Sequence, residues 1–173
     1  VLVLANDVML LYVAWEATTL VSFFLIARSG SHARKPAVRT LLVTILGGLA
    51  LLAAVAVMIA ATGTTVITEI LAADLWTQST PVTWIIVMLA LAAFTKSAQF
   101  PFQSWLPDSM VAISPVSAYL HAAAMVKAGI YLLLLFSPVL AGNTLWFVLL
   151  VSSGLITALM GAVSALRRYD LKE

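Results

Sequence analysis

The chain has 173 residues, of which 63% are hydrophobic and only 9% are charged, and its mean hydropathy is +1.10. A globular domain of this length needs far less apolar surface to build a core, so the composition predicts an integral membrane protein. The formal charge of +2 comes from basic residues in loops, which excludes a nucleic-acid partner, and the absence of cysteine excludes disulfides, Cys-ligated zinc and iron–sulfur clusters within the chain.

Five apolar segments follow one another, each close to the roughly 20 residues that cross a bilayer. The first, residues 7–27, begins at Asn6 or Asp7, whose side chains can accept hydrogen bonds from unpaired backbone amides. The second, residues 38–61, carries no charge after Arg39. Both segments predict transmembrane helices.

The third segment predicts a broken helix. It covers residues 81–99 and starts at Pro81, which is favourable at the first helical position. Pro101 lacks an N–H group and clashes with the preceding turn, so we expect a break near it and a continuation over residues 102–110 that also contains Pro107. Inside a membrane, the carbonyls freed by such a break must be satisfied by protein or water, and transporters use these sites to bind ions.

The fourth segment, residues 115–136, starts at Pro115 and is expected to end before Pro138. The fifth covers residues 143–166. We interpret residues 1–173 as one membrane domain without a soluble part. Because the chain begins with valine and not methionine, we expect it to be an internal piece of a longer protein.

The basic residues predict the orientation in the membrane. The loop 28–37 is rich in arginine and lysine and so is the C-terminal end, whereas the connection that contains Glu69 and Asp74 has no basic residue. The positive-inside rule therefore places loop 28–37 and the C-terminus in the cytoplasm. His32 lies in this loop and is interpreted as a solvated surface side chain.

Three ionisable residues lie within the apolar segments: Glu16, Lys96 and Lys127. A lysine near a bilayer centre costs roughly 2.5–3.5 kcal/mol on insertion scales, so charges at that depth mark candidate functional sites. The alternative is a static Glu–Lys pair that only holds helices together, but buried ion pairs stabilise poorly because desolvation offsets their attraction. The pattern favours a path for charge.

Two further ionisable residues are candidates. His121 precedes Lys127 by six residues, which in an α-helix places them about 9 Å apart along the axis and on different faces. His121 is either part of a proton relay or a histidine that donates to a backbone carbonyl. Asp108, in the sequence W-L-P-D-S-M, is expected near the cytoplasmic face, as a local cap or as a point of proton entry.

Three long motifs carry a resemblance to a known family. They are W-E-A-T-T-L-V-S-F-F-L-I (residues 15–26), T-K-S-A-Q-F-P-F-Q-S-W-L-P-D-S-M (95–110) and P-V-S-A-Y-L-H-A-A-A-M-V-K-A-G-I-Y-L (115–132). Together they resemble the proton-translocating antiporter family over essentially the whole chain. This family includes the large A-type component of the multisubunit, Mrp-type Na⁺/H⁺ antiporter and the antiporter-like membrane subunits of respiratory NADH:quinone oxidoreductase. The run L-V-T-I-L-G-G-L-A-L-L (42–52), and His121 together with Lys127, are more similar to the A-type component.

The resemblance implies roles for individual residues. Glu16 matches the glutamate that the family pairs with a lysine on the broken helix, and Lys96 matches that lysine. His121 and Lys127 match residues that continue the proton relay on the next helix. The resemblance also implies that the chain is one half of a pair of inverted five-helix repeats.

We therefore expect an all-α integral membrane protein that translocates protons within a cell-membrane, monovalent cation (Na⁺)/proton antiporter. Its expected partners are the other antiporter subunits, the lipid bilayer, protons and Na⁺. As part of a secondary transporter it is not expected to be an enzyme, and we expect no cofactor and no metal site. One alternative is a proton-pumping membrane subunit of respiratory NADH:quinone oxidoreductase, and a second is a membrane scaffold without transport.

Overall fold

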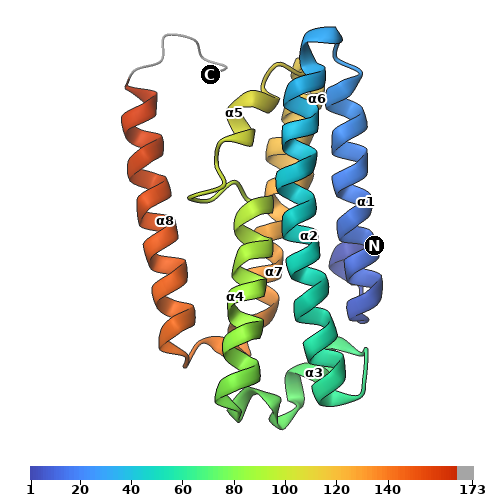
Figure 1. Ribbon diagram of the computed structural model, residues 1–173, viewed down its shortest axis with the longest axis vertical. Coiled ribbons are helices and arrows are strands. Elements are labelled where there is room, and N and C mark those ends of the chain that lie inside the picture. Colours follow the sequence, from blue (N-terminus) through green and yellow to red (C-terminus); the bar gives the residue numbers. More distant parts are fainter. Residues whose placement is uncertain (167–173) are drawn as a thin grey trace.

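The computed structural model describes residues 1–166, apart from the side chains of residues 31, 79 and 121–123. Within that range the fold is all-helical, and its long helices lie side by side along one direction (Figure 1). They are α1 (Val8–Ala27), α2 (Arg34–Thr62), α4 (Ser79–Lys96), α7 (Met125–Leu140) and α8 (Thr144–Ala165). In the bundle, α2 packs against α1 and α4, and α4 packs against α7, whereas α8 stands to one side (Figure 1).

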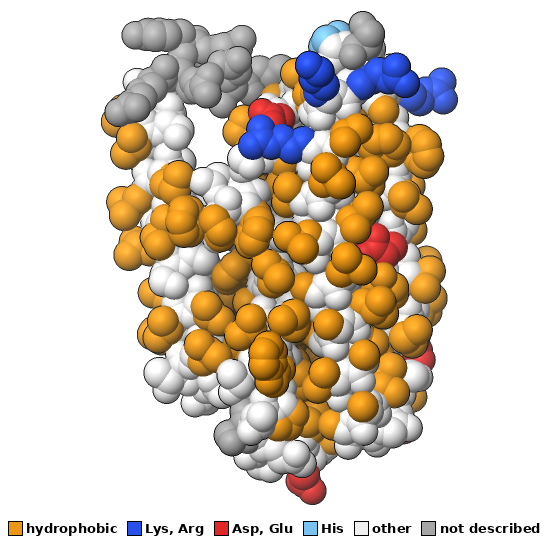
Figure 2. All heavy atoms as spheres, in the orientation of Figure 1, with side chains coloured by type: hydrophobic (Ala, Val, Ile, Leu, Met, Phe, Trp, Pro, Cys, Tyr) orange, Lys and Arg blue, Asp and Glu red, His pale blue; other side chains and the backbone are white. Residues whose placement is uncertain are grey.

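Three helices are long and apolar enough to cross a membrane: α1, α2 and α8. Two shorter apolar helices accompany them, residues 80–96 of α4 and the whole of α7. Large hydrophobic side chains are exposed along the bundle, as expected for a protein solvated by lipid (Figure 2). Five crossings of the bilayer stay a prediction, because three of the five helices reach a spanning length.

The start of α1 is fixed by Asp7, as its position in the sequence predicts. Its carboxylate accepts hydrogen bonds from the amides of Met9 and Leu10 and from the hydroxyl of Thr65. These bonds favour the ionised form, and the Thr65 hydroxyl is the largest reason why the pKa of Asp7 lies below its usual value. The same contacts attach the α1 terminus to the connection before α3 (Ile67–Ala72), a short helix that the sequence analysis did not predict.

Helix α2 begins at Arg34, four residues before the predicted boundary at 38. Pro36 lies in its first turn, where a missing N–H group leaves no hydrogen bond unmade, so proline does not stop the helix there. The helix ends at Gly63, whose φ of 73° is accessible to glycine at little cost and whose amide closes the last turn on Ile59.

Helix α4 ends at Lys96, three residues before the predicted boundary at 99. Ala98 has φ of 51°, and the amide of Gln99 donates to the carbonyl of Phe94, which is the hydrogen-bond pattern of a Schellman motif. The chain is therefore turned out of the helix before it reaches Pro101. Pro101 itself lies in the non-helical stretch that follows.

The predicted continuation over residues 102–110 is shorter in the structure. Helix α5 (Trp105–Ser109) is a single turn, and Pro107 is its third residue. In the first turn the backbone N–H groups have no partner within the helix, so Pro107 fits there without breaking a bond. The sequence predicts that Pro107 disturbs a helix, whereas the structure places it where a helix tolerates proline.

The fourth predicted helix, residues 115–136, is divided into three parts. It consists of α6 (Ser114–Ala118), a π-helical segment (Tyr119–Ala124) and α7. Helix α7 continues four residues beyond the predicted end and contains Pro138. Because Pro138 lies two residues before the last one, it removes a single backbone bond near the end, and the amide of Ala141 still closes on Ser137.

Helix α8 follows closely the predicted boundaries of residues 143–166. Asn143 caps its first turn by accepting from the amide of Leu145. Most of its side chains are exposed, with Trp146 and Ser153 buried. It touches the bundle where the amide of Phe100 donates to the hydroxyl of Thr157 at 2.8 Å.

Candidate functional site

The side chain of Lys96 is completely buried among α1, α2 and α4, at 0% exposure. Its Nζ donates to the hydroxyl of Thr19 at 2.7 Å and to the backbone carbonyl of Trp15 at 3.0 Å. It also lies 4.9 Å from the centre of the Trp15 ring, within range of a cation–π interaction. An ammonium at this position thus has several acceptors without a direct carboxylate contact.

The end of α4 positions Lys96 without leaving its last carbonyls unpaired. The carbonyl of Phe94 accepts from Gln99, and the carbonyl of Thr95 accepts from the indole Nε1 of Trp105 at 2.8 Å. Trp105 is itself completely buried. The protein, not solvent, therefore satisfies these two backbone groups next to Lys96.

Glu16 lies on α1, one residue after Trp15, and is half-buried. Its carboxylate fits into a space on α2 that exists because residue 48 is glycine, since a Cβ at Gly48 would overlap Oε1 of Glu16. In the described residues, the structure shows electrostatic interaction between Glu16 and Lys96 but no direct ion pair. The pairing implied by the family resemblance stays a prediction.

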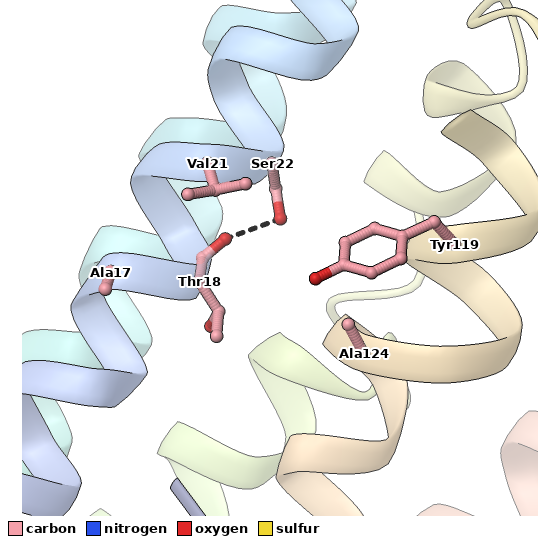
Figure 3. A pocket seen from close by; sticks show the side chains of 6 residues that line it. All are labelled: Ala17, Thr18, Val21, Ser22, Tyr119 and Ala124. Carbon is pink, nitrogen blue, oxygen red and sulfur yellow. Dashed lines mark hydrogen bonds between the residues drawn. The ribbon is translucent and has the colours of Figure 1, made fainter. Parts of the chain in front are cut away.

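Lys127 lies on α7 with its side chain exposed. It lines a pocket of about 420 Å³ together with Thr18, Ala124 and Tyr131. A smaller pocket of about 140 Å³ shares Thr18 and Ala124, and Figure 3 shows Tyr119 pointing across it toward α1. The two pockets therefore follow one face between α1 and α7, and this face leads to Lys127.

His121 belongs to the π-helical segment, and its side chain lies outside the described part of the structure. The spacing expected between His121 and Lys127 assumed a continuous α-helix. Since residues up to Ala124 follow a π-helix with a wider turn, that separation and angle do not apply. A π-helical segment inside an α-helix is frequent at functional sites, which keeps this region in the candidate site.

Helices α4 and α7 approach closely beside Lys96. The hydroxyl of Ser97 donates to the carbonyl of Val126 at 2.8 Å, next to Lys127 in the sequence. A Cβ at Gly129 would overlap the Ser97 hydroxyl and would lie 2.6 Å from the carbonyl oxygen of Ala93. Glycine at position 129 is thus required by the short distance between the two helices.

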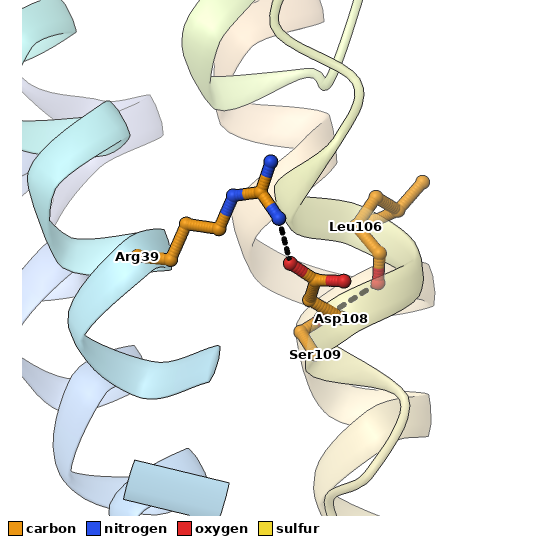
Figure 4. Close-up of polar contacts among 4 residues, drawn as sticks. All are labelled: Arg39, Leu106, Asp108 and Ser109. Atoms are coloured by element: carbon orange, nitrogen blue, oxygen red, sulfur yellow. Dashed lines mark hydrogen bonds and ion pairs between the residues drawn. The ribbon is translucent and has the colours of Figure 1, made fainter. Parts of the chain in front are cut away.

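Asp108 on α5 forms an ion pair with Arg39 on α2 at 2.6 Å (Figure 4). Both side chains are partly exposed, at 36% and 55% respectively. The basic side chains visible in Figure 2 gather at this same end of the molecule. The structure shows a bond between two helices here, and a role of Asp108 in proton entry stays a prediction.

The sequence analysis missed the residues that hold Lys96. Thr19 was not singled out, although threonines in apolar helices commonly bond to the carbonyl four residues earlier, and this one does so to Trp15 at 3.3 Å. Its partner Trp15 contributes a backbone carbonyl, which no sequence pattern reveals. Among the described residues, no cluster of acidic or histidine side chains could hold a metal ion.

Comparisons with known proteins agree with this arrangement. A family model described as NADH:quinone oxidoreductase/Mrp antiporter, TM, matches residues 5–173. The A-type component of the Na(+)/H(+) antiporter of Alkalihalophilus pseudofirmus is 47% identical over 174 residues, which cover 98% of this chain and 22% of that protein. The chain thus spans about a fifth of the length of the curated relatives that it matches.

Two solved structures contain chains with the same fold. One is the Mrp complex from Dietzia sp. DQ12-45-1b, with 61% identity, a TM-score of 0.97 and coverage of 99% of this chain and 19% of that chain. The other is respiratory complex I from Thermus thermophilus, with 27% identity, a TM-score of 0.83 and coverage of 97% and 37%. The chain therefore belongs to the proton-translocating antiporter family of membrane subunits, and it is similar to the A-type component of Mrp antiporters.

Proposed function

We propose that this chain is a proton-translocating segment in the A-type component of a multisubunit Na⁺/proton antiporter. Protons would move through Glu16, Lys96, His121, Lys127 and internal water, in exchange for Na⁺ carried by the complete complex. The other antiporter subunits and the bilayer would be its partners, and the chain would form one half of an inverted repeat. It would be part of a secondary transporter without enzyme activity.

The complete burial of Lys96 carries this proposal. A lysine kept at 0% exposure in an apolar bundle is costly unless its charge is used, and a side chain that gains and loses a proton uses it. The name of the relative in Alkalihalophilus pseudofirmus supports Na⁺ as the exchanged cation. Asp108, at the end where basic residues gather, is proposed as the entry group for protons.

Replacement of Lys96 tests the relay. Lys96→Ala removes the proton carrier, and Lys96→Arg places a guanidinium there that stays protonated, so we expect both variants to lose nearly all Na⁺-dependent proton flux. Flux is measured in vesicles that contain the full-length protein and its partners, and is divided by the amount of assembled complex. Lys35→Arg, at the exposed start of α2, is the control. Parental flux in Lys96→Arg would make Lys96 a fixed charge and refute the relay.

Respiratory complex I is the second candidate, because a chain in that structure reaches a TM-score of 0.83. The higher identity to a chain of an Mrp complex, 61% against 27%, favours the antiporter. The subunits that co-purify with the full-length protein distinguish the two. Flavin and iron–sulfur subunits would indicate the redox complex, whereas small membrane subunits without redox centres would support the antiporter. If uncharged replacements of Glu16, Lys96 and Lys127 left flux unchanged, the chain would be a scaffold.

The cytoplasmic location of loop 28–37 is part of the proposal. It rests on the basic residues at one end of the bundle and the acidic connection at the other. The single substitutions His32→Cys and Thr77→Cys, both at exposed positions, test it in intact cells with a thiol reagent that does not cross membranes. We expect labelling at position 77 alone, and labelling at position 32 alone would reverse the orientation.

A further inference from the structure

Glu16 and Lys96 each occupy a separate polar position, although they interact electrostatically. Lys96 is bound to Thr19 and to the Trp15 carbonyl, while the Glu16 carboxylate lies in the space at Gly48. We propose that Thr19 and Gly48 are positioning residues that keep this lysine and this carboxylate apart, and so set how often the two form a direct ion pair. The proposal rests on the proposed function for its transport consequence, and on the structure alone for the separation.

The hydrogen bonds around Thr19 show why it can hold an ammonium. Its single hydroxyl proton is directed to the Trp15 carbonyl at 3.3 Å, so its oxygen has lone pairs free to accept from Lys96 at 2.7 Å. The Trp15 carbonyl is shared, because it also accepts from the hydroxyl of Thr18 at 2.8 Å. Thr19 is therefore the shorter and less divided acceptor, and it is almost completely buried.

The space at Gly48 is the matching position for the carboxylate. A Cβ there would overlap Oε1 of Glu16 and lie 2.8 Å from its Cδ, so any larger residue must displace the carboxylate. The neighbouring Gly47 provides a matched comparison on the same helix. A Cβ at Gly47 would overlap the hydroxyl of Thr95 on α4 and would not meet Glu16.

Few other charged groups face this pair. On α1, Tyr12 interacts electrostatically with Glu16. On α2, the basic residues all lie in the first two turns, and Arg39 among them is bound to Asp108 of α5. On α7, Lys127 opens into a different pocket, and α8 carries no charged residue between 144 and 165. The ion-pair equilibrium is thus governed chiefly by the two positions occupied by Glu16 and Lys96.

The proposal predicts that two unrelated substitutions have the same effect. Thr19→Val removes the neutral acceptor of Lys96, and Gly48→Ala displaces the carboxylate of Glu16, so both favour the direct ion pair. Because an ion pair retains the lysine proton to more alkaline pH, we expect the alkaline limb of the flux–pH profile to move up by roughly one pH unit. Thr19→Ser, which keeps the hydroxyl, should restore the parental profile.

Three controls separate positioning from packing. Thr44→Val removes a buried hydroxyl on α2 that bonds only to backbone carbonyls, and Gly47→Ala adds a methyl group that meets Thr95. Both should leave the profile at the parental pH even if they lower total flux. In a Glu16→Gln background, Thr19→Val and Gly48→Ala should no longer shift the residual flux, since the partner of the ion pair is missing.

An infrared titration gives a readout that does not depend on transport. The difference spectrum between the parent complex and its Glu16→Gln variant isolates the carboxyl band of Glu16, and in Gly48→Ala this band should appear at a pH lower by roughly one unit. If the band titrates as in the parent, and Thr19→Val leaves the flux profile unshifted, the proposed separation is wrong. If even the parent transports no cation, the proposed function fails while the infrared result still decides this inference.

Discussion

The two lysines of the candidate site, Lys96 and Lys127, occupy opposite environments. Lys96 is enclosed at 0% exposure and bonded to Thr19 and a backbone carbonyl, whereas Lys127 is exposed and lines a pocket of about 420 Å³. Each follows a long apolar stretch of sequence, so hydropathy alone does not distinguish them. The surroundings of each side chain come from the neighbouring helices.

This difference assigns the two lysines different requirements. An enclosed ammonium depends on fixed acceptors, since no water can replace them, and a change of its partners changes its proton affinity strongly. A lysine in an open pocket can be solvated and can be reached by groups from outside the chain. We therefore expect substitutions around Lys96 to have larger effects than those around Lys127.

The largest expected effect comes from Glu16, the carboxylate nearest to the enclosed lysine in electrostatic terms. Glu16→Gln should reduce proton flux to a small fraction of the parent without loss of assembly, because it removes the charge that helps to hold a proton on Lys96. Flux and subunit content are measured in vesicles with the full-length protein. Glu69→Gln, in the connection at the other end, is the control and should leave flux unchanged. Equal flux in both variants would make Glu16 a packing residue.

A size change tests whether Lys96 is as tightly enclosed as its exposure indicates. Lys96→Arg should destabilise the assembled complex by roughly 1–3 kcal/mol, because the larger head group must overpack a filled site. Lys127→Arg should stay within about 0.5 kcal/mol of the parent, as surface substitutions usually do. Thermal unfolding of both purified complexes compares them directly. Identical melting temperatures would remove the distinction between the two environments.

Gly129 sharpens the comparison because it lies between the two lysines, where α4 and α7 are closest. Gly129→Ala should cost about 1–2 kcal/mol, since the new methyl group meets the Ala93 carbonyl and the Ser97 hydroxyl. Gly154→Ala, on α8 with no atom within 4 Å, should instead stabilise by roughly 0.5–1 kcal/mol through helix propensity. The measurement is again thermal unfolding, and a stabilised Gly129→Ala complex would contradict the close approach.

The smallest expected effect concerns the exposed ion pair between Arg39 and Asp108. A double-mutant cycle with Arg39→Gln and Asp108→Asn should give a coupling energy of about 0.2–1 kcal/mol, because solvent screens a pair at this exposure. The measurement is unfolding of the purified complex at low and high salt. A coupling well above this range, or one that salt does not reduce, would show that the pair is buried in the complete assembly.

Much of the helical framework could be predicted from composition and caps. Asp7 and Asn143 mark the starts of α1 and α8 because side-chain caps leave a local signal. The end of α4 could not be predicted, since it depends on the left-handed backbone of Ala98, a residue that ordinarily favours helix. The π-helical segment at Tyr119–Ala124 also has no simple sequence signal.

The candidate site was predicted by residue type more than by contact. An ionisable residue in an apolar stretch stands out in a sequence, which is why Glu16, Lys96 and Lys127 could be named. Their neighbours could not, because the acceptors of Lys96 are a threonine and a backbone carbonyl from another helix, 77 and 81 residues away in the chain. Long-range packing decides those contacts.

The bond between Trp105 and the carbonyl of Thr95 has a mechanical consequence. Trp105 and Asp108 belong to the same single-turn helix, one fixed to the residue before Lys96 and the other fixed to Arg39 near the basic end of α2. A short lever thus joins the surface of the bundle to its most enclosed charge, with no flexible link between its two ends. A force applied at the surface would reach the lysine through this lever.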